Sequence, residues 1–297
     1  MPSQIEWTDE TWNPVTGCTP VSEGCKNCYA ARMAKRLAGR AGYPKDDPFR
    51  VTRHADKQDD PLHWRKPRRV FVCSMGDLFH EDVPDAFIYR VLEVILLTPR
   101  HTYQMLTKRP GRMAAVLGGY EAIPNLWLGV TAENQQTADE RIPLLLQTPA
   151  AVRFVSIGPM LGPIDVSPYL GQVHADALGL PYKGDDPWHD GLDWVICGGE
   201  TGPGARPMNP KWVRDVRDQC MAAGVPFFFK GWGAWFPDEQ LDAERRASPG
   251  STMLPWAVPD SAIKKTVAAT YYRVGKKRAG RLLDGREWNE LPKEIKR

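Results

Sequence analysis

Residues 102–147 read TYQMLTKRPGRMAAVLGGYEAIPNLWLGVTAENQQTADERIPLLLQ, and this stretch holds the pattern that decides the fold. Two β-rich runs, at 102–107 and 125–131, are each followed by turn residues and then by apolar residues at three- and four-residue spacing. The runs are almost continuously apolar, which is typical of strands buried on both faces of a parallel sheet. The stretch therefore predicts two consecutive strand–helix units.

The same alternation extends in both directions from these units. Further runs predict strands at 69–74, 152–157, 192–197 and 225–230, and another is expected near 11–15. Helices are predicted at 85–97, 109–117, 135–147 and 210–223. Strands that alternate with helices predict an α/β fold, which we expect to be a partial or closed βα barrel of the TIM type. A doubly wound open sheet is the alternative that the sequence leaves open.

Two stretches interrupt this alternation. Residues 171–191 are rich in turn residues and predict an inserted loop, whereas residues 235–261 mix Pro, Gly, Ser and charge and predict a linker or lid. A basic segment follows at 271–292, and we expect it to pack on the barrel as an appendage. The expected organisation is thus a barrel over residues 1–233, which includes the inserted loop, and a linker with a C-terminal extension over residues 234–297.

The composition is that of an ordinary soluble globular protein, with 297 residues, 42% hydrophobic and 25% charged. Its net charge of +3 is too small to make the whole molecule a polycation. The first residues, MPSQIEWTDE, lack the basic and apolar regions of a secretory signal. The longest apolar run, at 88–97, is too short and too charged to span a bilayer. We therefore expect a cytoplasmic protein with no membrane partner.

Three cysteines, Cys18, Cys25 and Cys28, lie in one short loop. Three thiolates can hold three corners of a 4Fe-4S cluster and leave the fourth iron open to an outside ligand. Gly17 and Gly24 permit the turns that direct successive sulfurs toward one centre. The pattern after Cys28 is helical, so that cysteine is expected at a helix N-terminus, where backbone N–H groups favour thiolate charge. The loop therefore predicts an iron–sulfur site.

Two other interpretations of the same loop remain open. A structural zinc ion takes four protein ligands, and a fourth is available from His54, His63 or Cys73. The three thiols could also carry no metal. The other cysteines, Cys73, Cys197 and Cys220, have apolar neighbours in the sequence and are expected to be buried and free of disulfides in a reducing cytoplasm.

The run WNPVTGCTPVSEGCKNCYA at 12–30 resembles the opening of a phage-associated family of uncharacterised proteins, which in turn resembles radical S-adenosylmethionine (SAM) enzymes. The resemblance continues through SMGDLFHEDVP, MLTKRP, LWLGVTAEN, GPMLGPID, WVICGGETGPGARPM, FFFKGWG and GKKRAGRLLDGREWNELP, and so covers almost the whole chain. It implies a partial βα barrel with the cluster in the loop after the first strand. It also implies that SAM binds the open iron, that a flavodoxin- or ferredoxin-like protein donates electrons, and that the protein works in a bacterial or phage-infected host cell.

The chain departs from the resembled patterns at several positions. Radical SAM enzymes commonly have C-x-x-x-C-x-x-C, whereas six residues separate Cys18 from Cys25 here and two separate Cys25 from Cys28. Asn27 stands where an aromatic residue usually precedes the last cysteine, and Tyr29 lies on its other side. Within the narrower family, Gly158 occupies a position that is usually acidic, and Gly231 one that is usually Gln.

Polar residues follow the predicted strands one after another, and in a βα barrel reacting groups collect at these ends. Several of them could simply cap the next helix, but Lys108, Glu200 and Lys230 are poor caps, and we predict them to be catalytic. Gly198, Gly199 and Glu200 resemble the GGE element with which radical SAM enzymes hold the methionine amino group. In those enzymes it follows the second strand, where this chain has Ser74 and Asp77. The residues predicted to bind the cofactor are Asn13, Tyr29, Ser74, Asp77, Thr131 and Glu133.

Two basic stretches, RKPRR at 65–69 and KKRAGR at 276–281, have aromatic neighbours at Trp64, Tyr271, Tyr272 and Trp288. Basic groups that neutralise phosphates and aromatics that stack on bases predict a nucleic acid or nucleotide-like substrate, although a solvated charged face is the commoner meaning of such runs. The leading hypothesis is a radical SAM enzyme that modifies or repairs such a substrate. The rivals are a metal-stapled nucleic-acid-binding or redox-sensing module and a zinc-dependent hydrolase that acts on nucleic acid.

Overall fold

A parallel sheet of seven strands forms the centre of the molecule in the computed structural model, which describes residues 3, 5–171, 191–238, 252–260 and 265–292. Its strands are β1 (Glu10–Trp12), β4 (Arg69–Val72), β5 (Thr102–Thr107), β6 (Leu126–Ala132), β7 (Val152–Ile157), β8 (Trp194–Cys197) and β9 (Phe227–Phe229). Each predicted run contains or overlaps one of these strands. Strand β6 is buried at every position, as expected of a strand with both faces covered.

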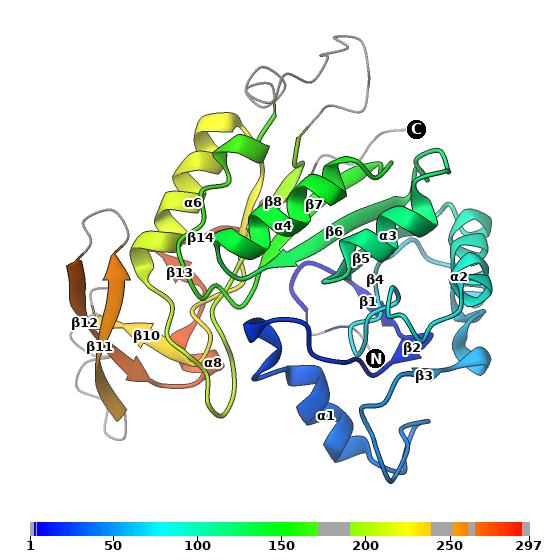
Figure 1. The fold of residues 1–297 in the computed structure, drawn as a ribbon, viewed down its shortest axis with the longest axis horizontal. Coiled ribbons are helices and arrows are strands. Elements are labelled where there is room, and N and C mark those ends of the chain that lie inside the picture. The colour runs from blue at the N-terminus through cyan, green and yellow to red at the C-terminus, as the bar shows by residue number, and fades with distance from the viewer. Residues whose placement is uncertain (1–2, 4, 172–190, 239–251, 261–264, 293–297) are drawn as a thin grey trace.

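The strand order is β1-β4-β5-β6-β7-β8-β9, and every neighbouring pair is parallel. The order never reverses, so no topological switch point exists in this sheet and the doubly wound alternative is wrong. Figure 1 shows the sheet with its helices outside it. The sheet begins at β1 and ends at β9 without joining them, so the prediction of a partial βα barrel is confirmed and a closed barrel is not formed.

Four helices cover the outer face of the sheet: α2 (Asp85–Leu97), α3 (Pro110–Leu117), α4 (Gln135–Leu146) and α6 (Pro210–Ala223). Their ends follow from local sequence signals. Asn134 caps α4 through a reciprocal pair of hydrogen bonds with Thr137, and Gly224 ends α6 in the left-handed conformation that glycine favours. The predicted helix ranges are therefore confirmed to within about a residue.

The inner face of the sheet holds a cluster of aromatic side chains. Trp7, which precedes β1, fills the interior and contacts Phe71, with ring centroids 4.7 Å apart, and Trp194, with centroids 6.0 Å apart. Phe154 and Phe228 complete the group. These rings fill the barrel interior below the C-terminal ends of the strands. Space for a site therefore remains at those C-terminal ends.

The cysteine loop and the segment after it lie beyond those strand ends. They include β2 (Val15–Thr16), which pairs with β3 (Thr52–Arg53), and helix α1 (Tyr29–Leu37). Short 3-10 turns complete the region: η1 (Glu23–Cys25), η2 (Ala55–Lys57) and η3 (Asp60–His63). A further turn, η4 (Ser167–Tyr169), follows β7.

The C-terminal part contains more regular structure than the sequence predicted. Strands β10 (Trp235–Pro237), β11 (Thr252–Asp260) and β12 (Lys265–Arg273) form an antiparallel sheet in the order β10-β12-β11, seen at the left of Figure 1. The linker or lid predicted over 235–261 is thus wrong for the described residues of that range. Helix α8 (Lys276–Ala279) and the hairpin β13 (Leu282–Leu283) and β14 (Arg286–Glu287) follow.

The inserted loop predicted at 171–191 lies almost wholly outside the described residues. On either side of it, the Leu192 N–H donates to the Tyr169 carbonyl at 2.8 Å. Among the described residues, no helix has both the length and the apolar character needed to cross a membrane.

Candidate active site

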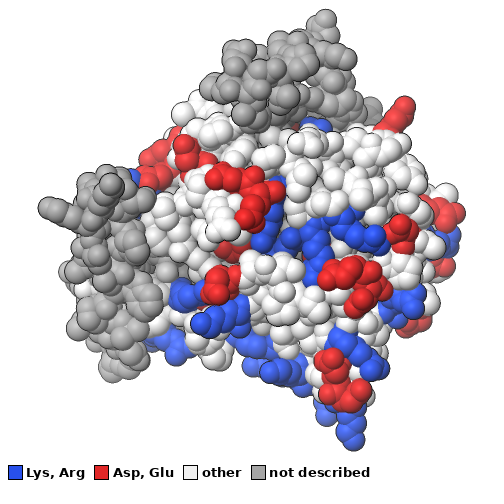
Figure 2. All heavy atoms as spheres, in the orientation of Figure 1, with Lys and Arg blue, Asp and Glu red and all other residues white. Residues whose placement is uncertain are grey.

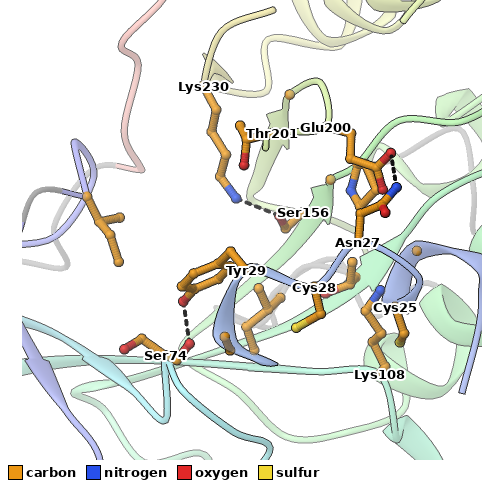
Figure 3. Close-up of a pocket in the computed structure, with 18 of the residues that line it drawn as sticks. Cys25, Asn27, Cys28, Tyr29, Ser74, Lys108, Ser156, Glu200, Thr201 and Lys230 are labelled. Atoms are coloured by element: carbon orange, nitrogen blue, oxygen red, sulfur yellow. Dashed lines mark hydrogen bonds between the residues drawn. The ribbon is translucent and has the colours of Figure 1, made fainter. Parts of the chain in front are cut away.

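A pocket of about 480 Å³ lies at the C-terminal ends of the barrel strands. This is the end at which βα barrels place their reacting groups, and the volume is within the usual range for small-molecule sites. Figure 3 shows its walls: the cysteine loop with Tyr29 on one side, Lys230 and Ser156 from the strand ends on the other, and Glu200 beside Asn27 of the cysteine loop. The predicted site residues that line it are Cys18, Cys25, Cys28, Tyr29, Ser74, Asp77, Lys108, Thr131, Glu200 and Lys230.

The three cysteines lie together on this pocket, each half-buried and none in a disulfide. Cys25 ends η1, and Cys28 is the N-cap residue of α1, as the sequence predicted. Glycine is required beside them. Gly17 has a φ of +84°, and a Cβ on Gly24 would lie 2.4 Å from the Glu133 carboxylate, so the loop can approach the strand ends only without a side chain there.

Positive charge accompanies two of the three thiols. The Arg109 guanidinium donates to Cys18 Sγ at 3.2 Å, although burial and the Asp77 carboxylate raise the pKa of Cys18 to about 11. Burial also opposes ionisation of Cys25, but the charge of Lys108 and hydrogen bonds from the loop outweigh it and lower the pKa of that thiol. A three-thiolate cluster is anionic, and these two cations are placed to offset its charge.

The donor set fits a cluster better than a single zinc ion. Among the described residues, no three histidine, cysteine or carboxylate groups converge closely enough to share one metal ion. Cluster cysteines bind different irons and need not converge in this way. Of the fourth ligands considered for zinc, His54 is hydrogen-bonded to Thr16 Oγ1 at 2.8 Å, and burial raises the pKa of the Cys73 thiol to about 12.

Asp77 lines the pocket but uses its carboxylate to hold the backbone around it. It accepts hydrogen bonds from Thr107 Oγ1 at 2.8 Å, from the Lys108 N–H at 3.2 Å and from the Phe79 N–H at 3.0 Å. Arg109 lies 3.4 Å away and links this carboxylate to Cys18. Asp77 therefore fixes the groups that carry charge toward the cysteine loop.

Two predicted site residues, Asn13 and Glu133, lie behind the pocket and do not line it. Asn13 Oδ1 accepts from Ser74 Oγ at 3.2 Å and from the Met75 N–H at 3.0 Å, and so holds the loop after β4. The Glu133 side chain is only 1% exposed and is paired with Lys108 and with Arg141. Asn13 and Glu133 therefore support residues that line the pocket. The Tyr29 hydroxyl, for example, donates to the carbonyl of Ser74, which Asn13 holds in place.

Glu200, Arg206 and Asn27 form a hydrogen-bonded group, called the clamp below, that holds the cysteine loop. Glu200 is 5% exposed and accepts from Arg206 Nη2 at 2.7 Å, from Arg206 Nε at 2.9 Å and from Asn27 Nδ2 at 3.0 Å. Burial alone would raise the pKa of Glu200, but the Arg206 hydrogen bonds lower it, so the carboxylate is ionised. Arg206 also donates to the Glu23 carbonyl at 2.9 Å, so this one guanidinium ties the loop after β8 to the cysteine loop.

Lys230 reaches into the pocket from the end of β9 (Figure 3). Its ammonium donates to Ser156 Oγ at 2.9 Å and lies 5.3 Å from the centre of the Trp7 ring. Burial lowers the pKa of Lys230 to about 8. Neither Trp7 nor Arg206 was predicted from the sequence to belong to this site.

Gly231 and Gly158 border the pocket but differ in what a side chain would meet. Gly231 has a φ of +119°, and its Cβ would lie 2.5 Å from the Gly280 carbonyl oxygen. We expect Gly231→Gln to lower the free energy of unfolding by on the order of 3 kcal/mol, because strain and overlap add. The Cβ of Gly158 would meet only Ser156 Oγ at 3.6 Å and Lys230 Nζ at 3.9 Å, so Gly158→Ala should cost less than about 1 kcal/mol. Urea unfolding of both variants measures this difference, and equal losses would contradict it.

The fold and site define an α/β half-barrel protein with a three-cysteine pocket at the C-terminal ends of its strands. The model of DUF5131, described as a protein of unknown function, matches residues 2–292, and the chain belongs to this family. No curated protein matches the chain.

Several solved structures of spore photoproduct lyase are similar to the chain. A cysteine-to-serine mutant of that enzyme has 11% sequence identity and a TM-score of 0.44, over 92% of this chain and 70% of that one. The lyase complexed with dinucleoside spore photoproduct has 10% identity and a TM-score of 0.40, over 89% and 68%. A mutant with bound AdoMet and dinucleoside spore photoproduct has 11% identity and a TM-score of 0.40, over 91% and 69%.

Proposed function

We propose that the chain is an iron–sulfur enzyme of radical SAM type that acts on a nucleic acid or nucleotide-like substrate. The observation that carries this proposal is the shared pocket. Cys18, Cys25 and Cys28 line the same cavity as Lys230, Glu200 and other polar groups from the strand ends. A metal used only as a structural staple would have no need of such a cavity beside its ligands.

Cys18, Cys25 and Cys28 would hold a 4Fe-4S cluster and leave one iron without a protein ligand. When bound, such a cluster supplies the electron for reductive cleavage of SAM, and hence the carbon radical that abstracts a hydrogen atom from the substrate. Lys108 and Arg109 offset negative charge at the thiolates. Tyr29, Ser74 and Thr131 line the cavity, and in this proposal they contact SAM.

The remaining predicted residues take positioning roles in this proposal. Asn13 holds the loop that carries Ser74, and Glu133 holds Lys108. Glu200, which the sequence predicted to be catalytic, has its carboxylate occupied by Arg206 and Asn27. We propose that it orients the cysteine loop, which leaves Lys230 as the catalytic or substrate-binding group at the opposite wall.

A basic rim beside the pocket supports a nucleic acid substrate. It consists of Lys276, Lys277 and Arg278 in α8, with Lys35 and Arg36 in α1, all of which are exposed. Figure 2 shows Lys and Arg side chains gathered over these two helices. Cations along such a rim can neutralise backbone phosphates while a nucleotide enters the cavity.

The other basic stretch, at 65–69, does not contribute to this rim. It precedes β4 and therefore lies at the opposite end of the sheet, and Arg68 forms an ion pair with Glu10 at 2.6 Å. The aromatic neighbours also differ from expectation, because Tyr271 and Trp288 are buried in the core and cannot stack on bases. The prediction that Tyr271 and Trp288 stack on bases is therefore wrong, because local sequence did not reveal that they are buried.

Anaerobic reconstitution with iron and sulfide tests the proposed function. We expect about four irons per chain, a paramagnetic-resonance signal after reduction that changes when SAM is added, and release of 5′-deoxyadenosine under reducing conditions. A well-formed cluster whose signal is unchanged by SAM would contradict the radical chemistry and favour the redox-sensing module. One equivalent of zinc, with no iron or sulfide in anaerobically purified protein, would contradict the cluster itself and favour the hydrolase.

A further inference from the structure

Lys230 has no carboxylate partner in the part of the chain that the structure describes, which sets it apart from the other cations of the pocket. Among the described residues, no acidic group lies within ion-pair distance of its ammonium, whose one hydrogen-bond partner is the neutral Ser156 hydroxyl. Lys230 is half-buried in the pocket wall, and a cation that has lost part of its water is normally paired, because an unpaired charge there is costly. The unmatched charge therefore points to a ligand that supplies the missing anion.

The other charged groups that line the cavity are already matched. Lys108 pairs with Glu133, Arg109 with Glu81 at 2.8 Å, and Lys276 with Glu6 at 3.5 Å. The three acids that line the pocket are matched as well, since Glu6 pairs with Lys276, Glu200 binds Arg206 and Asp77 accepts several hydrogen bonds. Of the charged groups that line the pocket, the Lys230 ammonium at the end of β9 is therefore the one that would attract an anion most strongly.

The surroundings of Lys230 favour an anion there. The buried Trp7 ring lies against the ammonium in place of water. The local dielectric constant is therefore low, and the ammonium attracts an anionic ligand more strongly than it would in water. At Gly158, where a Cβ would be 3.9 Å from the ammonium, the missing side chain leaves room for a ligand atom. Strand β9 is the seventh of the sheet, and the loops after the seventh and eighth strands often bind phosphate in βα barrels.

We infer that Lys230 and Ser156 form a subsite for a phosphoryl group of the substrate, across the pocket from the cysteines. The inference rests on the proposed function for the identity of the substrate, a nucleotide or nucleic acid. Lys230 donates to the phosphoryl oxygens and Ser156 supplies a second donor. The rest of the nucleotide then extends from this anchor toward the cysteine loop, where the reaction would occur.

Equilibrium binding to the full-length, anaerobically purified chain tests the subsite. The probes are the four deoxynucleoside 5′-monophosphates and the matching nucleosides, with inorganic phosphate as a competitor. We expect the wild type to bind at least one monophosphate about tenfold or more tightly than its nucleoside, as a charge-assisted hydrogen bond predicts. Lys230→Met should remove that difference while leaving the affinity for the nucleoside unchanged, and Lys230→Arg should retain it.

Lys211→Met is the matched control, because it removes the same charge from an exposed position in α6. It should bind every probe as the wild type does. Equal binding of monophosphate and nucleoside by the wild type would overturn the subsite, and so would an unchanged preference in Lys230→Met. None of these readings involves SAM, so failure of the radical chemistry and failure of the subsite are separate results.

The pH dependence gives an independent check. Only the protonated amine attracts phosphate, so affinity should fall as the pH rises through the pKa of Lys230, near 8. The Glu6 carboxylate and the Lys276 ammonium are the charged groups that act on Lys230, and the Ser156 and Trp7 side chains beside it do not ionise. Lys230→Arg should retain its phosphate affinity at pH 9.5, and a parallel loss in wild type and Lys230→Arg would contradict the assignment.

Discussion

Cys25→Ala should reduce the iron content of the reconstituted chain at least tenfold and abolish the paramagnetic-resonance signal. A cluster bound by three thiolates retains only two when one is removed, and the lost bond is not replaced by another side chain. Among the described residues, no group of three histidine, cysteine or carboxylate side chains offers an alternative metal site. Iron and sulfide analysis after anaerobic reconstitution, with the visible absorption spectrum, measures the effect. Cys18→Ala and Cys28→Ala should behave in the same way.

Cys220→Ala is the control for this experiment. Cys220 is also a free thiol, but it is buried in α6 on the outer face of the sheet and does not line the pocket. Its iron content should equal that of the wild type. We expect Cys25→Ala to keep its far-ultraviolet circular dichroism, because the cysteine is half-buried and lies outside the barrel core. Global unfolding of Cys25→Ala would show that the metal is a structural staple, and full iron content would exclude the cysteine from the site.

Arg206→Met should lower the free energy of unfolding at pH 7 by about 2 to 3 kcal/mol, which is large for a partly exposed side chain. The cause is the Glu200 carboxylate, which is 5% exposed and would keep only the Asn27 amide and the backbone N–H of residue 206 as partners, both of them uncharged. Removing one member of a buried ion pair leaves the other charge uncompensated. The same change releases the Glu23 carbonyl, so we also expect weaker retention of iron during gel filtration.

The loss in Arg206→Met should depend on pH with a definite sign. In the wild type the folded-state pKa of Glu200 is lowered, so its stabilising contribution is present at neutral pH and declines as the pH falls through that pKa. Without Arg206 the Glu200 carboxylate carries an uncompensated charge at neutral pH, and protonation removes that charge. The difference in the free energy of unfolding between the two proteins should therefore shrink toward pH 4. Urea unfolding at several pH values measures this. Arg90→Met, which breaks an exposed pair with Asp59, should cost no more than about 1 kcal/mol, and an equal loss in both variants would rule out the clamp.

Much of the barrel could be predicted because its signals are local. The run at 102–107 is a strand with the predicted bounds, and the helix at 85–97 begins after Pro84 as its capping pattern indicated. Strand burial on both faces, helix periodicity and capping are all properties of neighbouring residues. The shared position of Cys18, Ser74, Lys108 and Lys230 also followed, since parallel strands bring their C-terminal ends to one side.

The remaining features depend on contacts between distant parts of the chain. Nothing near Glu200 in the sequence reveals that Asn27 donates to it, and nothing near Glu133 reveals its place behind Lys108. The strands at 235–237 and 252–260 were interpreted as a linker because their β character is diluted by proline and charge, and their pairing with β12 supplies the missing stabilisation. Trp7 precedes the first strand, where local pattern alone does not show that it fills the interior.

The open edge of the half barrel has a consequence for how this chain could be divided or recombined. The outer edge of β9 is covered by residues near the C-terminus: the Phe229 N–H donates to the Trp288 carbonyl at 2.9 Å, and the Trp232 indole donates to the Leu282 carbonyl at 2.8 Å. Ending the chain near residue 234 would remove the residues that cover this edge. The backbone groups of β9 would then be free to pair with a strand of another molecule. The barrel therefore depends on its C-terminal segment, and a gene fragment that ends after the last barrel strand should yield an aggregating product.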